Sequence, residues 1–167
     1  HRAPVPIVTG VNGVAAGEGI SIAIMGNVVL LSDAARMEYA YPRLGLTGDG
    51  GSTFLLPRLV GLRRAKEIVL QDDPIGPERA VELGLASEVV PAADLETRVE
   101  ETAAELASGP TWAMARTKRL LTESFGRELE AQMAAETESM TAATQTEDYS
   151  RAYEAFFEKE EPEFVGR

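Results

Sequence analysis

Asp49 is the side chain whose surroundings in this sequence most favour chemistry. It stands between Gly48 and Gly50 in the stretch YPRLGLTGDGGSTFLLPRLVG, and no basic residue is nearer than Arg43 or Arg58. An acid in a glycine-flanked loop can be a turn residue that hydrogen-bonds its own backbone. It can also be a reactive carboxylate that a tight backbone aims at a substrate. Composition does not choose between these two interpretations.

A second stretch, GVNGVAAGEGIS, places four glycines before a short apolar segment. Glycines let the backbone turn sharply, and the start of a helix offers unpaired N–H groups and the positive end of its dipole. A phosphate-binding loop would need a lysine here, but the first lysine is Lys66; a dinucleotide fingerprint would need glycine where Ile22 stands. Two interpretations remain: an oxyanion hole built from backbone amides, and a purely structural turn.

The chain lacks the residues of several other chemistries. It has no Cys, which excludes disulfides, a thiol nucleophile and a Cys-bound metal. Its one His is His1, at the end of the sequence, where we interpret it as an expression remnant. A Ser-His-Asp triad and His-bound zinc are therefore excluded. We predict no metal, and any catalysis falls to carboxylates, hydroxyls or backbone amides.

The charge balance bears on partners and location. The net charge is -11, and twelve acidic but only four basic residues follow from Glu123 onward. Nucleic acid is not expected as a partner, because phosphate binding needs clustered Lys and Arg. No apolar run is long enough to span a membrane and no signal-peptide pattern opens the sequence. We therefore expect a cytoplasmic protein that does not bind membranes.

The elements that must position these residues alternate in type through residues 1–90. Periodicity predicts strands at 6–11, 28–32, 35–40 and 86–90, and helices that start near 17–19, 52, 62 and 77. We expect Pro57 to end or kink the second of these helices. Residues 91–167 instead predict four helices in succession, the last ended by Pro162. The change of class near Val90 predicts an α/β core at 1–90 and a helical oligomerisation or lid region at 91–167.

The order of five segments adds a resemblance to a known family. PIVTGVNGVAAGEGISIAI, SDAARMEYAYPRLGL, GDGGSTFLLPRLVGLRRAKEIVL, RAVELGLASEVVP and AFFEKEEPEF resemble consecutive signatures of the enoyl-CoA hydratase/isomerase (crotonase) family. The resemblance covers nearly the whole chain and implies the ββα spiral core of that family, in part, with a C-terminal helical extension. It also implies that the family's first β/α turns, with one oxyanion-hole amide and part of the CoA surface, are absent here.

The resemblance also implies roles for particular residues. The backbone N–H of Glu18 matches the family's second oxyanion-hole donor. Ser21 and Tyr41 stand where family hydratases carry their two glutamates, which leaves them as substrate-pocket candidates. Asp49, four residues after Gly45, matches the catalytic aspartate of the family's isomerases, closest to the branch that acts on epoxidised phenylacetyl-CoA.

The resemblance further implies an acyl-CoA thioester as substrate, with coenzyme A as part of it and no other cofactor. Phe156 and Lys159 match the family's C-terminal segment and are candidates for CoA binding. Apolar stripes such as Leu95, Val99 and Leu106 are expected to be buried between the subunits of a homo-trimer or hexamer. The leading hypothesis is an acyl-CoA isomerase with Asp49 as acid and base. The alternatives are a catalytically silent CoA-thioester-binding component and, third, an enoyl-CoA hydratase.

Overall fold

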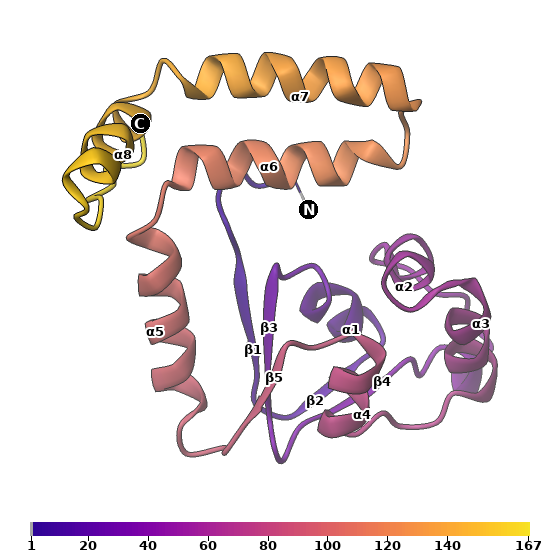
Figure 1. Ribbon diagram of the computed structural model, residues 1–167. Helices are drawn as coiled ribbons and strands as arrows, with labels where there is room; N and C mark the ends of the chain where they lie inside the picture. The colour runs from indigo at the N-terminus through magenta and orange to yellow at the C-terminus, as the bar shows by residue number, and fades with distance from the viewer. Residues whose placement is uncertain (1) are drawn as a thin grey trace. The chain divides into compact units, whose positions relative to one another are not determined.

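The computed structural model describes residues 2–167, and its contacts divide the chain into two compact units. The first is Ile7–Thr102; the second comprises Arg2–Pro6 and Ala103–Arg167. The division falls inside one helix, twelve residues beyond the change of composition near Val90. Strands and helices mix in the first unit and helices alone follow it (Figure 1), so the predicted α/β class is confirmed.

The first unit is built on a parallel sheet in the order β1-β3-β5, from Val8–Val11, Val28–Ser32 and Glu88–Val90. Successive side chains of a strand point to opposite faces, and β3 shows this clearly. Val29 and Leu31 pack into the main core, whereas Leu30 packs into a smaller cluster on the other face. The sheet is therefore covered on both faces, which suits the apolar run of its central strand β3.

Helix α5, Leu95–Ala107, covers the second of these faces. Leu95 is buried in the smaller cluster and Val99 packs against it, so these two side chains are covered by the chain's own sheet. The expectation that Leu95 and Val99 lie between subunits was wrong. Gly10 of β1 has no side chain, so α5 packs closely against the sheet and covers both residues. A Cβ on Gly10 would stand 2.7 Å from Val99 Cγ2, a separation that only glycine permits.

A second, two-stranded parallel sheet pairs β2, Val14–Ala16, with β4, Arg36–Glu38. Strand β2 was not predicted; it is only three residues long and lies in the glycine turn. The chain continues from it through Gly17 into α1, Glu18–Ala23. Met37 of β4 also forms an antiparallel bridge with Ile75, which ties this sheet to the segment after α3.

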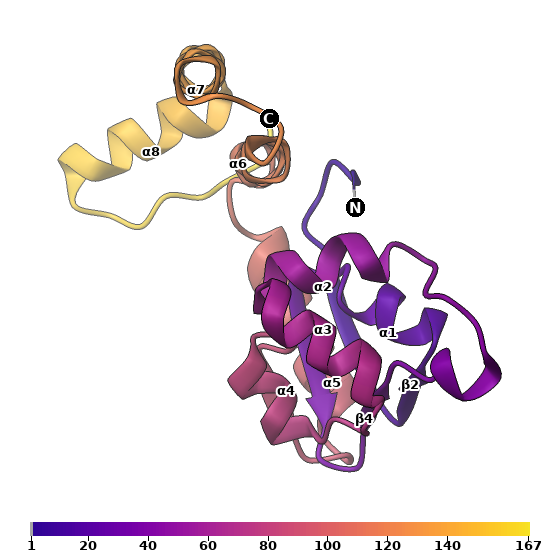
Figure 2. The same cartoon turned by 90° about the vertical axis from the view of Figure 1, so that its right-hand side faces the viewer.

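Three further helices complete the first unit: α2 at Ser52–Val60, α3 at Leu62–Gln71 and α4 at Pro77–Leu83. They follow a short 3₁₀ turn at Pro42–Leu44, and α2 and α3 pack against each other (Figure 2). Pro57 does not end α2, which continues to Val60. Of the two effects predicted for Pro57, an end to the helix is excluded, since the loss of one N–H leaves the rest of this short helix paired, and a kink there stays a prediction.

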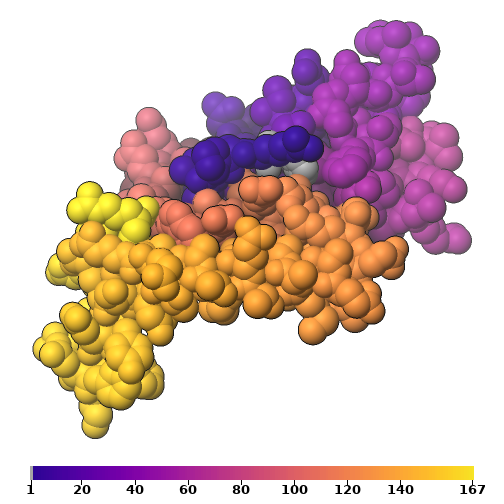
Figure 3. All heavy atoms as spheres, turned by 90° about the horizontal axis from the view of Figure 1, so that it is seen from above, coloured from indigo at the N-terminus to yellow at the C-terminus, as the bar shows by residue number. Residues whose placement is uncertain are grey.

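The second unit contains α6, Thr111–Ser124, α7, Leu129–Ala143, and α8, Glu147–Glu158. Helices α6 and α7 lie side by side, and the segment Arg2–Pro6 runs along this unit, where Lys118 Nζ donates to Val5 O at 2.9 Å (Figure 3). Helix α8 ends before Pro162, contrary to prediction. Lys159 adopts a left-handed conformation, φ 61°, and its N–H bonds to Ala155 O, which closes the helix there.

None of the helices formed by residues 2–167 combines the length and apolar composition that a bilayer crossing needs.

Candidate active site

The loop that carries Asp49 is held by its backbone. Gly50 and Gly51 both adopt positive φ, 58° and 85°, and turn the chain into α2. The carbonyl oxygen of Asp49 then accepts three hydrogen bonds: from Ser52 N at 3.0 Å, Ser52 Oγ at 2.9 Å and Ser21 Oγ at 3.1 Å. Both serines are fully buried. The peptide at position 49 is therefore fixed from α2 and from α1 together.

The carboxylate of Asp49 has a separate partner. Tyr41 Oη donates a hydrogen bond to Asp49 Oδ1, while the residue as a whole remains exposed. Tyr41 itself is only 7% exposed. Burial, followed by the hydrogen bond to the Asp49 carboxylate, raises the pKa of Tyr41 above its ordinary value. The phenol is thus kept in its neutral, proton-donating form at neutral pH and well into the alkaline range.

Tyr39 packs against both Tyr41 and the loop of Asp49. Its ring lies edge-on to that of Tyr41, with centroids 4.8 Å apart, and it is 5% exposed. A Cβ built on Gly48 would lie 1.9 Å from Tyr39 Oη and 2.8 Å from Ser52 Oγ. Glycine is therefore required at position 48, because the tyrosine hydroxyl fills the space that a side chain would take.

The start of α1 lies beside this loop. A Cβ on Gly50 would stand 3.1 Å from Glu18 Cγ and 2.9 Å from Ser21 Cβ, which shows how closely the two segments approach. Gly17, with φ 56°, turns the chain into the helix, and its N–H donates to Glu38 O at 3.0 Å. Glu18 is the first residue of α1, so its N–H has no acceptor within the helix. Its side chain is exposed.

The structure thus brings Glu18, Ser21, Tyr41 and Asp49 together, as the sequence predicted for a single site. Ser21 differs from its expected setting, since its hydroxyl is turned onto a carbonyl oxygen of the loop and is fully buried. Whether these residues act on a substrate remains a prediction.

Sequence reasoning missed an ionic cluster that fixes the segment ahead of Tyr41. Arg43 bonds Asp72 through Nε at 2.8 Å and Glu38 through Nη1 at 2.7 Å, and Arg36 also pairs with Glu38. Asp72 Oδ1 accepts the N–H of Ala40 at 2.6 Å. Arg43 and Asp72 are 29 positions apart, and Asp72 reads locally as an ordinary turn residue after a helix. No pattern in the sequence connects them.

This cluster shifts two ionisation equilibria. Hydrogen bonds from Arg36 and then from Arg43 hold the pKa of Glu38 below its ordinary value. The hydrogen bond to Glu38, with further attraction from Asp72, raises the pKa of Arg43. Both groups are therefore charged throughout the neutral range. Ion pairs hold the segment between β4 and the 3₁₀ turn in place.

Phe156 and Lys159, the candidates for CoA binding, belong to the second unit. Phe156 is 77% exposed and its ring stands edge-on to Phe157, with centroids 5.5 Å apart. Lys159 is the left-handed residue that closes α8 and is likewise exposed. Both side chains are open to a ligand, but their role in binding remains a prediction.

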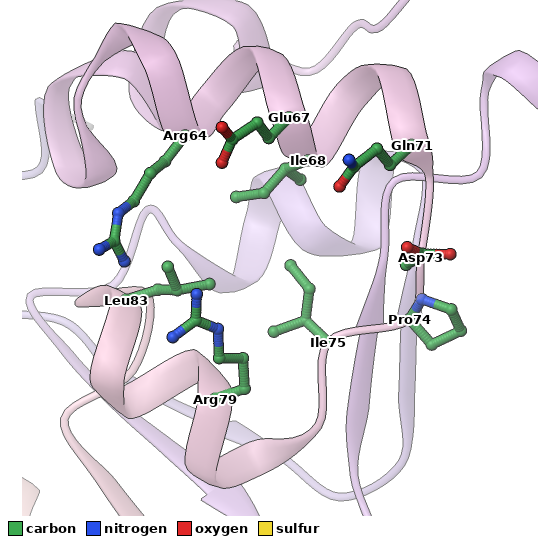
Figure 4. Close-up of a pocket in the computed structure, with 9 residues that line it drawn as sticks. All are labelled: Arg64, Glu67, Ile68, Gln71, Asp73, Pro74, Ile75, Arg79 and Leu83. Atoms are coloured by element: carbon green, nitrogen blue, oxygen red, sulfur yellow. The ribbon is translucent and has the colours of Figure 1, made fainter.

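A separate hollow of about 220 Å³ lies between α3 and α4 (Figure 4). Ile68, Ile75 and Leu83 form apolar lining, while the guanidinium groups of Arg64 and Arg79 reach toward it. None of the residues predicted to act on a substrate lines this hollow. Among residues 2–167, no three His, Cys, Asp or Glu side chains gather as a metal would require.

Comparison with known proteins connects this geometry to a family. A family model described as enoyl-CoA hydratase/isomerase matches residues 1–167. A probable enoyl-CoA hydratase of Rhodobacter capsulatus is 38% identical over the whole chain, which covers 65% of that protein. The 1,2-epoxyphenylacetyl-CoA isomerase of Escherichia coli is 32% identical over 99% of the chain and 63% of its own length.

Solved structures agree with these sequence relatives. A putative enoyl-CoA hydratase/isomerase from Mycobacterium abscessus superposes with a TM-score of 0.95 at 32% identity, over 98% of this chain and 63% of that one. The crotonase fold expected from the resemblance is therefore confirmed. The chain spans a little under two thirds of the length of the relatives it matches.

Proposed function

Because this chain belongs to the enoyl-CoA hydratase/isomerase family, we propose that it is an acyl-CoA isomerase in which Asp49 is the acid and base. The observation that carries the proposal is the placement of Asp49. Its peptide is held from both sides, the residue is exposed, and the neighbouring Gly50 lies against Glu18 and Ser21 of α1. Proton transfer beside a thioester requires a fixed carboxylate together with backbone donors for the carbonyl oxygen.

In the proposed reaction, Asp49 removes a proton from the carbon next to the thioester carbonyl and returns it to another carbon. Negative charge develops on the carbonyl oxygen between these two steps. The N–H of Glu18 is the donor in this chain that we assign to that oxygen, and loss of one such donor typically costs about 3 kcal/mol. One carboxylate is enough, because the proton that leaves is the proton that returns.

The two residues that hydrogen-bond to Asp49 from other segments, Ser21 and Tyr41, favour an isomerase over a hydratase. Hydration needs one group to activate water and another to deliver a proton. Ser21 is buried and donates to a carbonyl oxygen, and Tyr41 donates to Asp49 itself. Neither offers a second carboxylate, so addition of water lacks its usual pair of acid and base.

The assay is a panel of unsaturated acyl-CoA thioesters, given to the full-length gene product and to its Asp49→Asn variant. We expect a product of unchanged mass from the unaltered protein, and a loss of roughly 10²- to 10⁴-fold in turnover from the variant. Binding of a saturated acyl-CoA, measured by calorimetry, should change little, because Asn keeps the size of the side chain and the backbone bonds.

The same change at another exposed loop acid, Asp73→Asn, is the matched control and should leave turnover unaltered. Undiminished turnover in Asp49→Asn would contradict the assignment of the acid and base. A product heavier by one water would identify a hydratase. Binding without any turnover would identify the catalytically silent alternative.

The substrate assignment extends to the second unit. We propose that Phe156 and Lys159 contact the CoA portion of a thioester bound by a neighbouring subunit, a ring for the adenine and a cation for phosphate. Both are exposed on or just after α8, which is the observation in favour. The proposal requires no cofactor besides the CoA carried by the substrate.

A further inference from the structure

We propose that Tyr41 is a positioning residue for the reaction: its hydroxyl holds Oδ1 of Asp49, so that Oδ2 is the oxygen offered to the substrate. This inference rests on the proposed function, because a carboxylate needs aiming only if it exchanges protons. The direct observation is the hydrogen bond from Tyr41 Oη to Asp49 Oδ1. Within residues 2–167, Oδ2 accepts no such bond.

The first step of the argument is that this bond is not what anchors the loop. The loop is anchored at the carbonyl oxygen of Asp49, by two donors on Ser52 and one on Ser21. All of these bonds use the main chain of position 49 and would persist with any side chain there. The bond from Tyr41 instead fixes the rotation of the carboxylate, which the anchoring bonds leave free.

The second step is that packing and backbone hydrogen bonds hold Tyr41 in place. Its ring is buried and stands edge-on to Tyr39. Its N–H donates to Tyr39 O at 2.9 Å, and its carbonyl oxygen accepts from the N–H groups of Leu44 and Leu46, both at 3.0 Å. A donor held at its ring and at both backbone groups can define one orientation of the group it contacts.

The third step is that the chain ahead of Tyr41 adopts a costly conformation. Ala40 has φ 63°, a left-handed geometry that is strained for a residue with a Cβ. Asp72 Oδ1 holds the N–H of Ala40 in this geometry, and Arg43 holds Asp72. Strain that the surroundings maintain is characteristic of functional sites. Here its effect is to direct the ring of Tyr41 toward the loop of Asp49.

The consequence for chemistry concerns one oxygen. With Oδ1 engaged, proton removal and return both pass through Oδ2, and the carboxylate does not need to find its orientation in each turnover. The titratable side chains of Tyr41, Tyr39 and Glu18 lie against the loop of Asp49. Only Tyr41 among these donates to the carboxylate.

The test compares Tyr41→Phe with the unaltered full-length protein on a substrate that it isomerises. We expect kcat to fall roughly 10- to 100-fold, the range for one hydrogen bond to a charged group, with KM changed less than about threefold.

Tyr149→Phe is the control, since it removes a tyrosine hydroxyl from a partly exposed residue of α8 that is not among the contacts of the Asp49 loop, and it should change neither kcat nor KM. An unchanged kcat in Tyr41→Phe would overturn the inference. So would a change in KM as large as the fall in kcat, which would indicate a disturbed pocket and not a misdirected carboxylate. If Asp49→Asn turns over normally, the proposed function fails; if it is inactive while Tyr41→Phe is fully active, only the role of Tyr41 fails.

Discussion

At the scale of residues, the closest steric restriction in the loop of Asp49 is at Gly48. Gly48→Ala would place a methyl group 1.9 Å from Tyr39 Oη, and the buried Tyr39 ring has no free space to enter. We expect a loss of about 1–3 kcal/mol in the free energy of unfolding, as overpacking usually costs. Turnover should fall as well, since the loop that carries Asp49 must shift. Denaturant unfolding and steady-state kinetics measure the two effects.

Gly13→Ala is the matched control for this change. Nothing lies within 4 Å of the Cβ that it would add, and its backbone is not left-handed. Its unfolding free energy should stay within about 0.5 kcal/mol of the parent, as for ordinary surface changes. If the two variants lose equal stability, contact with Tyr39 is not what excludes a side chain at position 48.

The residues of the candidate site were predicted to different depths. The glycines around Asp49 single it out locally, and Tyr41 was assigned to the same pocket by its place in the motif. The bond between them was not predictable, because Tyr41 and Asp49 are eight positions apart and the loop between them reverses at Gly45, φ 67°. The buried role of Ser21 was equally hidden, since its partner is a main-chain oxygen 28 positions away.

At the scale of elements, Glu38 at the end of β4 is a buried acid that pairs with two arginines, Arg36 and Arg43. Its folded pKa lies below the ordinary value of 4.5, so its ion pairs add stability above pH 4.5 that is lost as pH falls through the folded value. Glu38→Gln should therefore lower the thermal midpoint at pH 7. The difference between variant and parent should shrink as pH falls from 5 to 3.

Glu82→Gln provides the comparison, because Glu82 also pairs with an arginine but is 64% exposed at its side chain, against 10% for Glu38. Exposed pairs contribute little, so the midpoint of this variant should stay near that of the parent. A difference for Glu38→Gln that is constant from pH 7 to pH 3 would show that its ionisation does not support the fold.

The elements themselves were largely predictable where their patterns are long. The buried strands at 28–32 and 86–90 and the helices from 92 onward follow apolar periodicity, and the structure contains them. Strand β2 escaped because Val14–Ala16 offers three residues between glycines, too few to show a period. The end of α8 was misplaced because a left-handed Lys159 has no signature comparable to a proline or glycine stop.

At the scale of the whole molecule, the second unit leaves many large apolar side chains exposed. Large apolar side chains of α6, α7, α8 and their connections remain accessible: Leu121, Phe125, Leu129, Met133, Met140, Phe156 and Phe157. Such surface favours association. We therefore expect a homo-oligomer, a trimer or hexamer, with these side chains at the subunit contacts. Analytical ultracentrifugation at micromolar concentration should give a multiple of the single-chain mass.

Leu129→Glu tests whether these side chains are responsible, because Leu129 is 68% exposed and begins α7. A charge there should lower the mass of the assembly without unfolding the chain, since most of the side chain is open to solvent within the unit. A parent protein that sediments as one chain would contradict the expectation, and so would a variant that assembles as fully as the parent.

The three bonds to the carbonyl oxygen of Asp49 have a consequence for how this protein can change over generations. They use an atom that every amino acid possesses, and the side chain at position 49 takes no part in them. A codon change there can alter the chemistry offered at the loop while leaving the loop's attachment intact. Lineages that inherit this arrangement are free to explore new reactions at one position, without first having to rebuild the scaffold that presents it.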